Sequence, residues 1–400
     1  MLTSTWVGKA VGKVSRPALS NKRSVRRLSG KAQATAAPTK LLKPLKSTVF
    51  MFTGQGSQIP GMGKDIAAQW QVAKDVFDDA DDAIRMNLSA RMFDGTAADL
   101  QPTPIAQPAL VAHAMAVLAV LKKELKKDPV ASSCCVLGHS IGEITGLAAT
   151  EGINLPTAVK FAHQRGIYMA AAVPKNEQTG MAALFPLSLT QAKALCLEAV
   201  KRAYPHGYTG ADGVTRSEAI LDVACINSPK IIVISGEKKA LETAMSIAAN
   251  GEMGEKSKAI LLDVSAPFHS RYMLPAHQGL KKYVNGLNIK LTTAPVISGY
   301  STQPMRIFDQ FMENFIPLTS APVNFVGCIQ QATNLLSTQS QPVENPLWIE
   351  IGPKPTLTSF VTQTLGPKAE TVSLCTAEDI KNFLKNQQLV ERLFPSKKKN

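Results

Sequence analysis

Cysteine is scarce in this sequence, and long apolar runs are absent. The six cysteines form no Cys-x-x-Cys pair and have no histidine at zinc-site spacing. We therefore expect free thiols packed as small core residues, and neither a metal nor a cofactor. No apolar run approaches the roughly 18 residues that a membrane span requires. The best candidate, Ala109–Leu121, is too short and is interrupted by His113, so no membrane span is predicted.

Acidic residues are absent from the first 48 positions, which carry eleven lysines and arginines. This segment supplies most of the net charge of +14 and leaves +3 for the remainder, so the charge does not predict nucleic-acid binding. A basic, serine-rich segment without acids or an apolar stretch is typical of an organelle transit peptide. We expect residues 1–46 to be a cleaved transit peptide, mitochondrial because Arg26-Arg27-Leu28-Ser29 suits the mitochondrial processing protease. A plastid peptide, or a basic arm that binds polyanions, is the alternative.

Hydrophobic residues make up 45% of the 400 positions and charged residues 18%, which is typical of a globular enzyme of one or two domains. Strand-like and helix-like stretches alternate, and within residues 180–263 they follow the order β-α-β-β-α-β of a split ferredoxin-like unit. This order predicts a small subdomain inserted into a larger α/β domain, residues 47–179 and 264–400. A polar, glycine-rich insertion, Tyr204–Arg216, has no role that the sequence indicates.

A glycine-rich loop, Gly54–Gln58, follows the first strand-like run, Ser47–Thr53. Such a loop after a first strand often builds a site in α/β folds. No Gly-Lys-Ser/Thr follows it, which argues against a phosphate loop. Farther along, Asp99–Gln107 is expected to be a loop. Pro108 is expected to begin a buried helix of about eighteen residues, because proline suits a first helical position.

A serine lies between two glycines where a short strand meets a helix. The strand-like run Cys134–Leu137 leads into Gly138-His139-Ser140-Ile141-Gly142, and a helical stretch begins at Ile144. The Gly-x-Ser-x-Gly pattern is typical of a turn that presents a serine nucleophile. Glycines permit the sharp turn, and the free N–H groups of a helix start suit developing negative charge. On the pattern alone, an ordinary glycine-rich turn is the alternative.

A serine nucleophile needs a base, and the chain has six histidines. His269 is the best placed of them, because it lies on a loop where a strand has just ended. His139 adjoins the serine, so its side chain is expected to point away. The others lie in helical or polar stretches that favour structural or surface roles: His113, His163, His206 and His277.

One arginine lies on the apolar face of a predicted helix, Leu155–Val173. Ala158, Ala162, Arg165 and Met169 share this face at helical spacing. A charge there is costly unless an anion meets it. A structural ion pair is one explanation; the other is a substrate carboxylate held by the planar guanidinium.

A series of short motifs runs along the chain from about Val49 to Thr364. The motifs are Phe52-Thr53-Gly54-Gln55-Gly56-Ser57-Gln58, Gln107-Pro108-Ala109-Leu110, Gly138-His139-Ser140-Ile141-Gly142-Glu143, Arg165-Gly166-Ile167-Tyr168-Met169, Gly180-Met181-Ala182-Ala183, Asn227-Ser228-Pro229, Val264–His269, Pro322-Val323 and Glu350-Ile351-Gly352-Pro353. Their set and order resemble the malonyl-CoA:acyl carrier protein transacylase family. The collinear set is far more specific than any one motif.

The resemblance implies an α/β-hydrolase-like large domain with an inserted ferredoxin-like subdomain. It makes Ser140 the nucleophile and His269 the general base and acid, oriented by backbone carbonyls rather than by a triad carboxylate. It assigns the oxyanion hole to the backbone N–H groups of Gln55 and Ile141, in agreement with the glycine-rich loop and the helix start. The implied reaction is ping-pong transfer of malonyl from coenzyme A to acyl carrier protein for fatty-acid synthesis.

The resemblance also implies substrate contacts. Arg165 would hold the malonyl carboxylate, with Gln107 and Met169 nearby; core or cap roles are the alternative for these two. In related polyketide acyltransferases, Phe at the position of Phe268 accompanies malonyl and Ser accompanies methylmalonyl. Phe268 is therefore expected to restrict the acyl α-carbon.

The chain departs from the family at Ser298-Gly299, where many members have Asn-Asn or Ser-Asn. If the carbonyl at this position orients the histidine, glycine retains it; if the side chain matters, the orientation is in doubt. Two other functions compete with acyl transfer: a serine esterase or thioesterase that uses water, and a non-catalytic carrier-protein binder. The expected partners are acyl carrier protein and malonyl-CoA, and we expect a monomer.

Overall fold

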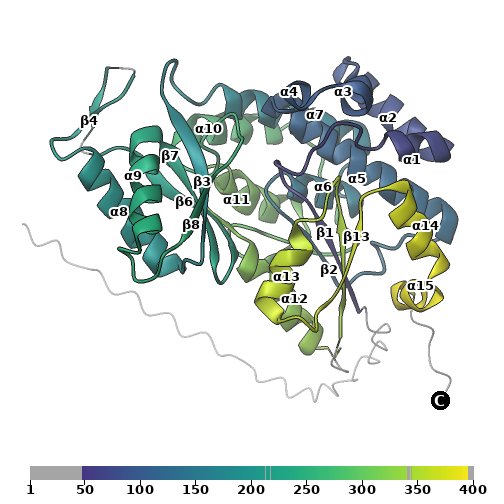
Figure 1. The fold of residues 1–400 in the computed structure, drawn as a ribbon. Coiled ribbons are helices and arrows are strands. Elements are labelled where there is room, and N and C mark those ends of the chain that lie inside the picture. Colours follow the sequence, from purple (N-terminus) through teal and green to yellow (C-terminus); the bar gives the residue numbers. More distant parts are fainter. Residues whose placement is uncertain (1–46, 212, 217, 340–342, 344, 395–400) are drawn as a thin grey trace, which may run out of the picture. The chain divides into compact units, whose positions relative to one another are not determined.

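The larger of the two main sheets has six strands in the order β10-β9-β2-β1-β12-β13 (Figure 1). The computed structural model describes residues 47–394 except 212, 217, 340–342 and 344, so the predicted transit peptide lies outside the described residues. The strands are β1 (Thr48–Phe52), β2 (Cys135–Gly138), β9 (Val296–Ile297), β10 (Pro304–Met305), β12 (Leu347–Ile351) and β13 (Glu370–Leu374). Neighbours are parallel except β9 and β10. Every residue of β1 and β12 is buried, which explains their nearly continuous apolar sequences.

Helices connect these strands and pack on the sheet and on one another (Figure 1). They are α1 (Lys64–Gln69), α2 (Gln71–Ile84), α3 (Leu88–Asp94), α4 (Ala97–Leu100), α5 (Thr103–Leu125), α6 (Gly142–Ala149), α7 (Leu155–Ala170), α10 (Leu274–Val284), α11 (Phe308–Leu318), α12 (Phe325–Ser337), α13 (Leu357–Leu365), α14 (Ala377–Lys385) and α15 (Gln387–Leu393). A 3-10 turn, Arg271–Met273, precedes α10. All six cysteines are free and five are buried, which confirms their expected role as small core residues.

Helix α5 begins at Thr103, so the prediction that it begins at Pro108 was wrong. Pro104 occupies the first turn and Pro108 lies inside the helix. Pro108 has no N–H to donate to the carbonyl four residues earlier, that of Pro104. The Nδ1 atom of His163 on α7 lies 2.8 Å from this carbonyl oxygen and replaces the missing donor. A tertiary contact therefore allows a proline that a local argument places at the helix start.

By length and composition, α5 is also apolar enough to cross a membrane. It is the one such helix in the part of the chain that the structure describes, and 83% of its 18-residue apolar stretch is buried inside the protein. Contacts with α2, α7 and α14 cover it. Its apolar sequence therefore fits a core helix.

The second sheet has five strands in the order β11-β6-β7-β3-β8. Its elements are β3 (Thr179–Phe185), α8 (Leu189–Ala203), β6 (Leu221–Ser228), β7 (Ile231–Glu237), α9 (Lys238–Asn250), β8 (Lys258–Leu261) and β11 (Val323–Asn324). The pairings β3–β7, β3–β8 and β6–β7 are antiparallel, which gives the predicted ferredoxin-like arrangement. A separate core forms where α8 and α9 pack on this sheet. The sequence did not predict β11, which comes from the returning chain and pairs in parallel with β6.

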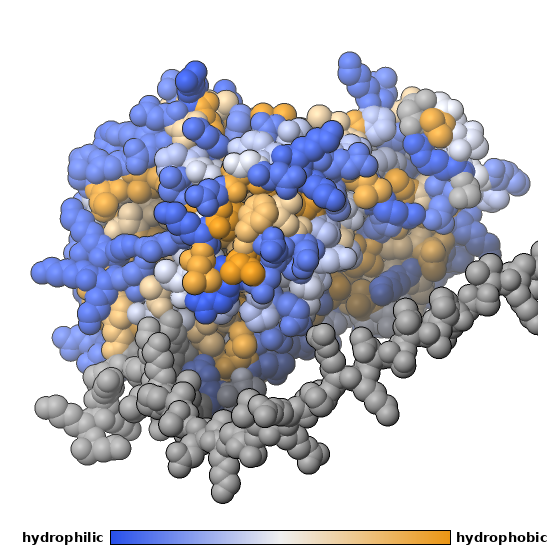
Figure 2. Space-filling model, turned by 180° about the vertical axis from the view of Figure 1, so that it is seen from behind, coloured by the Kyte–Doolittle hydropathy of each residue, from blue (hydrophilic) through white to orange (hydrophobic). Residues whose placement is uncertain are grey.

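The insertion Tyr204–Arg216 contains a short hairpin of its own. Its strands are β4 (Tyr208–Thr209) and β5 (Thr215–Arg216), paired antiparallel. Figure 2 shows the face of the molecule turned away from the viewer in Figure 1: polar side chains cover most of it, and apolar ones form several separate groups.

Candidate active site

Ser140 lies at the sharp turn between β2 and α6. Its φ angle of 55° is in the left-handed region, so the serine itself makes the turn. The flanking glycines are needed for close approach: a Cβ on Gly138 would lie 2.2 Å from the backbone nitrogen of Glu143, and one on Gly142 would lie 2.2 Å from the Phe52 carbonyl oxygen. The local sequence thus builds a strained turn that carries the hydroxyl group at the end of a parallel strand.

The structure brings His269 to this serine. The Nε2 atom of His269 lies 2.7 Å from Ser140 Oγ, and its Nδ1 atom lies 2.8 Å from the carbonyl oxygen of Leu318 at the end of α11. The Nδ1–H therefore donates to a backbone carbonyl, which leaves Nε2 free to accept the serine proton. Leu318 carries no side-chain signal for this role, so only the fold identifies it.

The departure from the family pattern at Ser298-Gly299 is not explained by the orientation of His269. The Gly299 carbonyl accepts the N–H of Asn324 at 2.7 Å and does not orient His269. The Gly299 N–H donates to Glu143 Oε1 at 2.5 Å, and a Cβ on Gly299 would lie only 2.9 Å from that oxygen. Glycine at position 299 therefore permits the close contact with Glu143, and the orientation of the histidine does not depend on it.

The N–H groups of Gln55 and Ile141 come from two adjacent loops. Strands β1 and β2 are parallel neighbours, so Gly54–Gln58 after β1 and the serine turn after β2 meet at the same edge of the sheet. Neither N–H donates to a protein acceptor within residues 47–394, the six omitted positions aside. The Gln55 side chain is fixed by the Thr103 hydroxyl group. This arrangement suits two donors that receive an oxyanion.

Arg165 is 1% exposed and lies beside the serine. Its guanidinium donates to Ser140 Oγ at 3.1 Å and to Gln107 Oε1 at 2.8 Å, while its Nε has no partner among the described residues. No carboxylate of the described chain lies within 4.0 Å of it. The predicted buried face of α7 is confirmed, because Ala158, Ala162 and Met169 are buried as well.

Electrostatics keep His269 neutral and Arg165 charged, which are the forms that the chemistry needs. Burial, helped by the nearby Arg165 guanidinium, lowers the pKa of His269 to about 3, so the imidazole is neutral at pH 7. Burial lowers the pKa of Arg165 to about 10, with the charge of Glu143 opposing, so the guanidinium stays charged. Burial also raises the pKa of Glu143 to about 8. This carboxyl group is therefore weakly ionised and neutralises Arg165 only in part.

A cleft of about 480 Å³ opens onto these groups. All the residues predicted for the site, except the buried Ile141, line it: Gln55, Gln107, Ser140, Arg165, Met169, Phe268 and His269. Gln107 bridges Arg165 and the Met169 sulfur, at 3.6 Å, so it orients the guanidinium. The lining residues to which the sequence analysis gave no role include Lys354, after β12, and Asn227, whose Oδ1 lies 2.9 Å from His139 Nε2. The Asn227-Ser228-Pro229 motif was a signal for the second.

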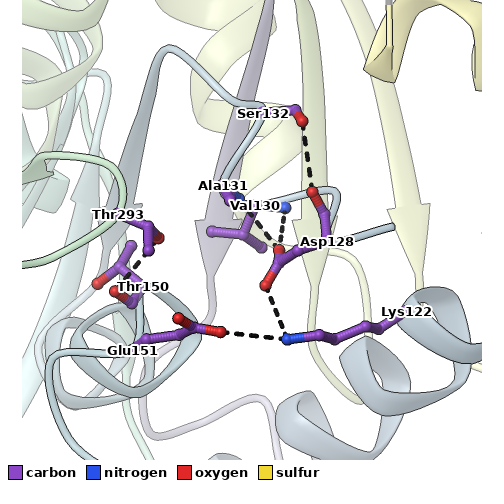
Figure 3. Close-up of polar contacts among 8 residues, drawn as sticks. All are labelled: Lys122, Asp128, Val130, Ala131, Ser132, Thr150, Glu151 and Thr293. Atoms are coloured by element: carbon purple, nitrogen blue, oxygen red, sulfur yellow. Dashed lines mark hydrogen bonds and ion pairs between the residues drawn. The ribbon is translucent and has the colours of Figure 1, made fainter. Parts of the chain in front are cut away.

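A larger cleft of about 900 Å³ lies at the other end of β2 and contains neither Ser140 nor His269. In this cleft, Lys122 Nζ lies 3.2 Å from both Asp128 Oδ2 and Glu151 Oε1 (Figure 3). The Asp128 carboxylate also accepts the backbone N–H groups of Val130 and Ala131. These contacts fix the turn that leads into β2.

Fold and site together define a serine acyltransferase with a Ser–His pair. Residues 49–394 match the acyl transferase domain family. The chain is 34% identical over 337 residues to the malonyl CoA-acyl carrier protein transacylase of Bacillus subtilis (strain 168), covering 84% of this chain and 96% of the relative. The chain therefore belongs to the malonyl CoA-acyl carrier protein transacylase family.

Solved structures agree with this assignment. The acyl-carrier-protein-S-malonyltransferase of Bartonella henselae superposes with a TM-score of 0.71 at 31% identity, covering 85% of this chain and 98% of that one. A malonyl-transacylase in complex with a type II PKS acyl-carrier protein gives 0.73 at 25% identity, covering 85% and 100%. These similarities support the α/β-hydrolase-like fold with its ferredoxin-like subdomain.

Proposed function

We propose that this protein transfers malonyl from malonyl-CoA to the phosphopantetheine thiol of acyl carrier protein, for fatty-acid synthesis. The observation that carries the proposal is the buried Arg165, which has no carboxylate partner among the described residues and lies 3.1 Å from the nucleophile. A malonyl group offers both a thioester for Ser140 and a carboxylate for this guanidinium.

The loading step follows from the geometry. Ser140 Oγ attacks the thioester carbonyl while His269 Nε2 accepts its proton. The oxyanion would receive the N–H groups of Gln55 and Ile141. The C–S bond then breaks, and coenzyme A leaves as a thiol with the proton from His269. In the second half, His269 takes the proton of the carrier thiol, whose sulfur displaces Ser140 Oγ from the malonyl ester, and His269 then returns the proton to Ser140 Oγ.

The decisive test is the intact mass of the protein after exposure to malonyl-CoA. We expect the added mass of one malonyl group, located on Ser140, and its removal by holo acyl carrier protein. An adduct that water removes as fast as carrier protein does would favour the esterase instead. Buffer alone and apo carrier protein, which lacks the thiol, are the controls.

Phe268 should restrict the acyl group at its α-carbon. Its side chain lines the cleft directly before His269 and is 5% exposed. A methyl branch in an apolar pocket is worth about 10–200-fold in kcat/KM, so we expect a preference for malonyl-CoA over methylmalonyl-CoA of that order, reduced by Phe268→Ser. Competition between the two thioesters measures it. Equal turnover by the unmodified enzyme would contradict this role.

We propose a mitochondrial location, supported by the basic, acid-free segment of residues 1–46. Fused to a fluorescent reporter, this segment should direct the reporter to mitochondria and be absent from the mature protein. A matched fusion in which Arg26 and Arg27 are replaced by Glu should stay in the cytosol. Import of the unaltered fusion into plastids, or its retention in the cytosol, would contradict the proposal.

The expectation that the protein is a monomer also stays a prediction.

A further inference from the structure

The insertion Tyr204–Arg216 is linked, through the carboxylate of Glu177, to the chain segment that follows the catalytic histidine. Glu177, in the loop before β3, accepts hydrogen bonds from the Tyr208 hydroxyl group and from the backbone N–H of Ala211, the latter at 2.8 Å. The same carboxylate accepts the Tyr272 hydroxyl group at 3.1 Å. Tyr208 and Tyr272 are both buried. One carboxylate therefore joins the insertion to the 3-10 turn Arg271–Met273.

Arg271, in the same turn, makes a second connection. Its backbone N–H donates to Asp222 Oδ2 at 2.8 Å, and its Nε donates to Asp222 Oδ1 at 3.0 Å. Its NH1 donates to Glu218 Oε1 at 3.1 Å. Asp222 belongs to β6, and Glu218 lies two residues beyond the insertion. The chain that directly follows the insertion thus holds the turn.

His269 needs such support, because it has a φ angle of 59°. A residue with a Cβ stays in this conformation only where its surroundings fix it. The Leu318 carbonyl fixes the imidazole ring of His269. The 3-10 turn Arg271–Met273 begins two residues after His269, so whatever holds this turn also limits the backbone of the histidine. We propose that Glu177, Asp222 and Glu218 form, with the insertion, a brace that positions His269 through Arg271 and Tyr272. The proposal rests on the acyl-transfer function and gives that site a positioning element.

The chain provides a matched pair of arginines for the test. Arg271 pairs with Asp222 and Glu218 and its side chain is 47% exposed; Arg202 pairs with Glu198 and Glu252 and is 46% exposed. Arg202 lies on α8, and neither of its acid partners contacts the histidine segment. If only the loss of a surface ion pair matters, Arg271→Ala and Arg202→Ala will behave alike. Tyr272→Phe removes a single oxygen and retains the ring, so it tests the brace with little risk to folding.

The readout is the reaction of Ser140 with a fluorophosphonate, followed in the full-length protein by mass spectrometry. Ser140 Oγ bonds to phosphorus, the P–F bond breaks, fluoride leaves and His269 takes the proton. This step needs the histidine but not malonyl-CoA. Varying the probe concentration separates the limiting rate from the affinity, and thermal unfolding is measured for each variant.

We expect both Arg271→Ala and Tyr272→Phe to lower the limiting rate. For Arg271→Ala the loss should be about tenfold, because a displaced histidine would lose only part of the 10²–10⁴-fold acceleration that a general base contributes. Probe affinity should not change, and Arg202→Ala should match the parent. Parental limiting rates in both Arg271→Ala and Tyr272→Phe would overturn the brace, as would an equal loss in Arg202→Ala. A parent that reacts with the probe but takes no malonyl from malonyl-CoA would overturn the proposed function alone, and the variant comparison would still decide the brace.

Discussion

Replacing Ser140 with alanine should abolish the malonyl adduct, and replacing His269 with alanine should slow both its formation and its discharge by about 10²–10⁴-fold, the usual contribution of a general acid–base group. The Nε2 atom of His269 lies 2.7 Å from Ser140 Oγ and is neutral at pH 7, because the pKa of the imidazole is lowered to about 3. Rapid-quench mass spectrometry measures both half-reactions.

His139 is the matched control for this prediction. It adjoins Ser140 in the sequence, but its Nε2 lies 2.9 Å from Asn227 Oδ1. We expect His139→Ala to cost less than His269→Ala in each half-reaction. A larger loss for His139→Ala, or an adduct on the Ser140→Ala variant, would mean that the base or the nucleophile is wrongly assigned. Unchanged thermal unfolding of the alanine variants would show that these losses are chemical.

Arg165→Ala should change which acyl group the enzyme accepts. Two hydrogen bonds to a charged group contribute about 1.5–3 kcal/mol each, so losing both should lower kcat/KM for malonyl-CoA by at least about 100-fold. Acetyl-CoA, which has no carboxylate, should become competitive because no buried guanidinium is left unpaired. Arg165→Lys should restore little, since an ammonium group cannot present two donors in one plane. Turnover of the two thioesters by each variant measures the change.

The structural explanation of Arg165 makes a different prediction. If the guanidinium only supports the fold, Arg165→Ala will lower thermal stability and reduce malonyl and acetyl turnover in the same proportion.

A pH profile of the loading rate tests the interaction between Arg165 and His269. The positive charge of Arg165 helps lower the pKa of His269, so its removal should raise that pKa. The acid limb of the loading rate should then move to higher pH in Arg165→Ala, whereas its position should stay unchanged if the two groups do not interact.

Some features were predictable because they depend on local sequence. The apolar run before Gly138 forms β2, and the two glycines flank a turn that only small residues permit. The helical spacing around Arg165 identified a buried charge, since a 3.6-residue period assigns each side chain to a face without knowledge of what covers it. The β-α-β-β-α-β order likewise gave the ferredoxin-like subdomain, because strand order strongly limits the possible sheets.

The remaining features depend on contacts between distant segments. The Leu318 carbonyl orients His269, His163 compensates for Pro108, and Glu143 requires Gly299. Backbone carbonyls are chemically alike at every position, so no residue type marks the one that will meet the histidine. By itself, the sequence determined the serine turn, the arginine and the candidate base. Only the tertiary structure decided which carbonyl, carboxylate and loop surround them, because those partners are 49 to 156 residues away along the chain and meet only when the sheet forms.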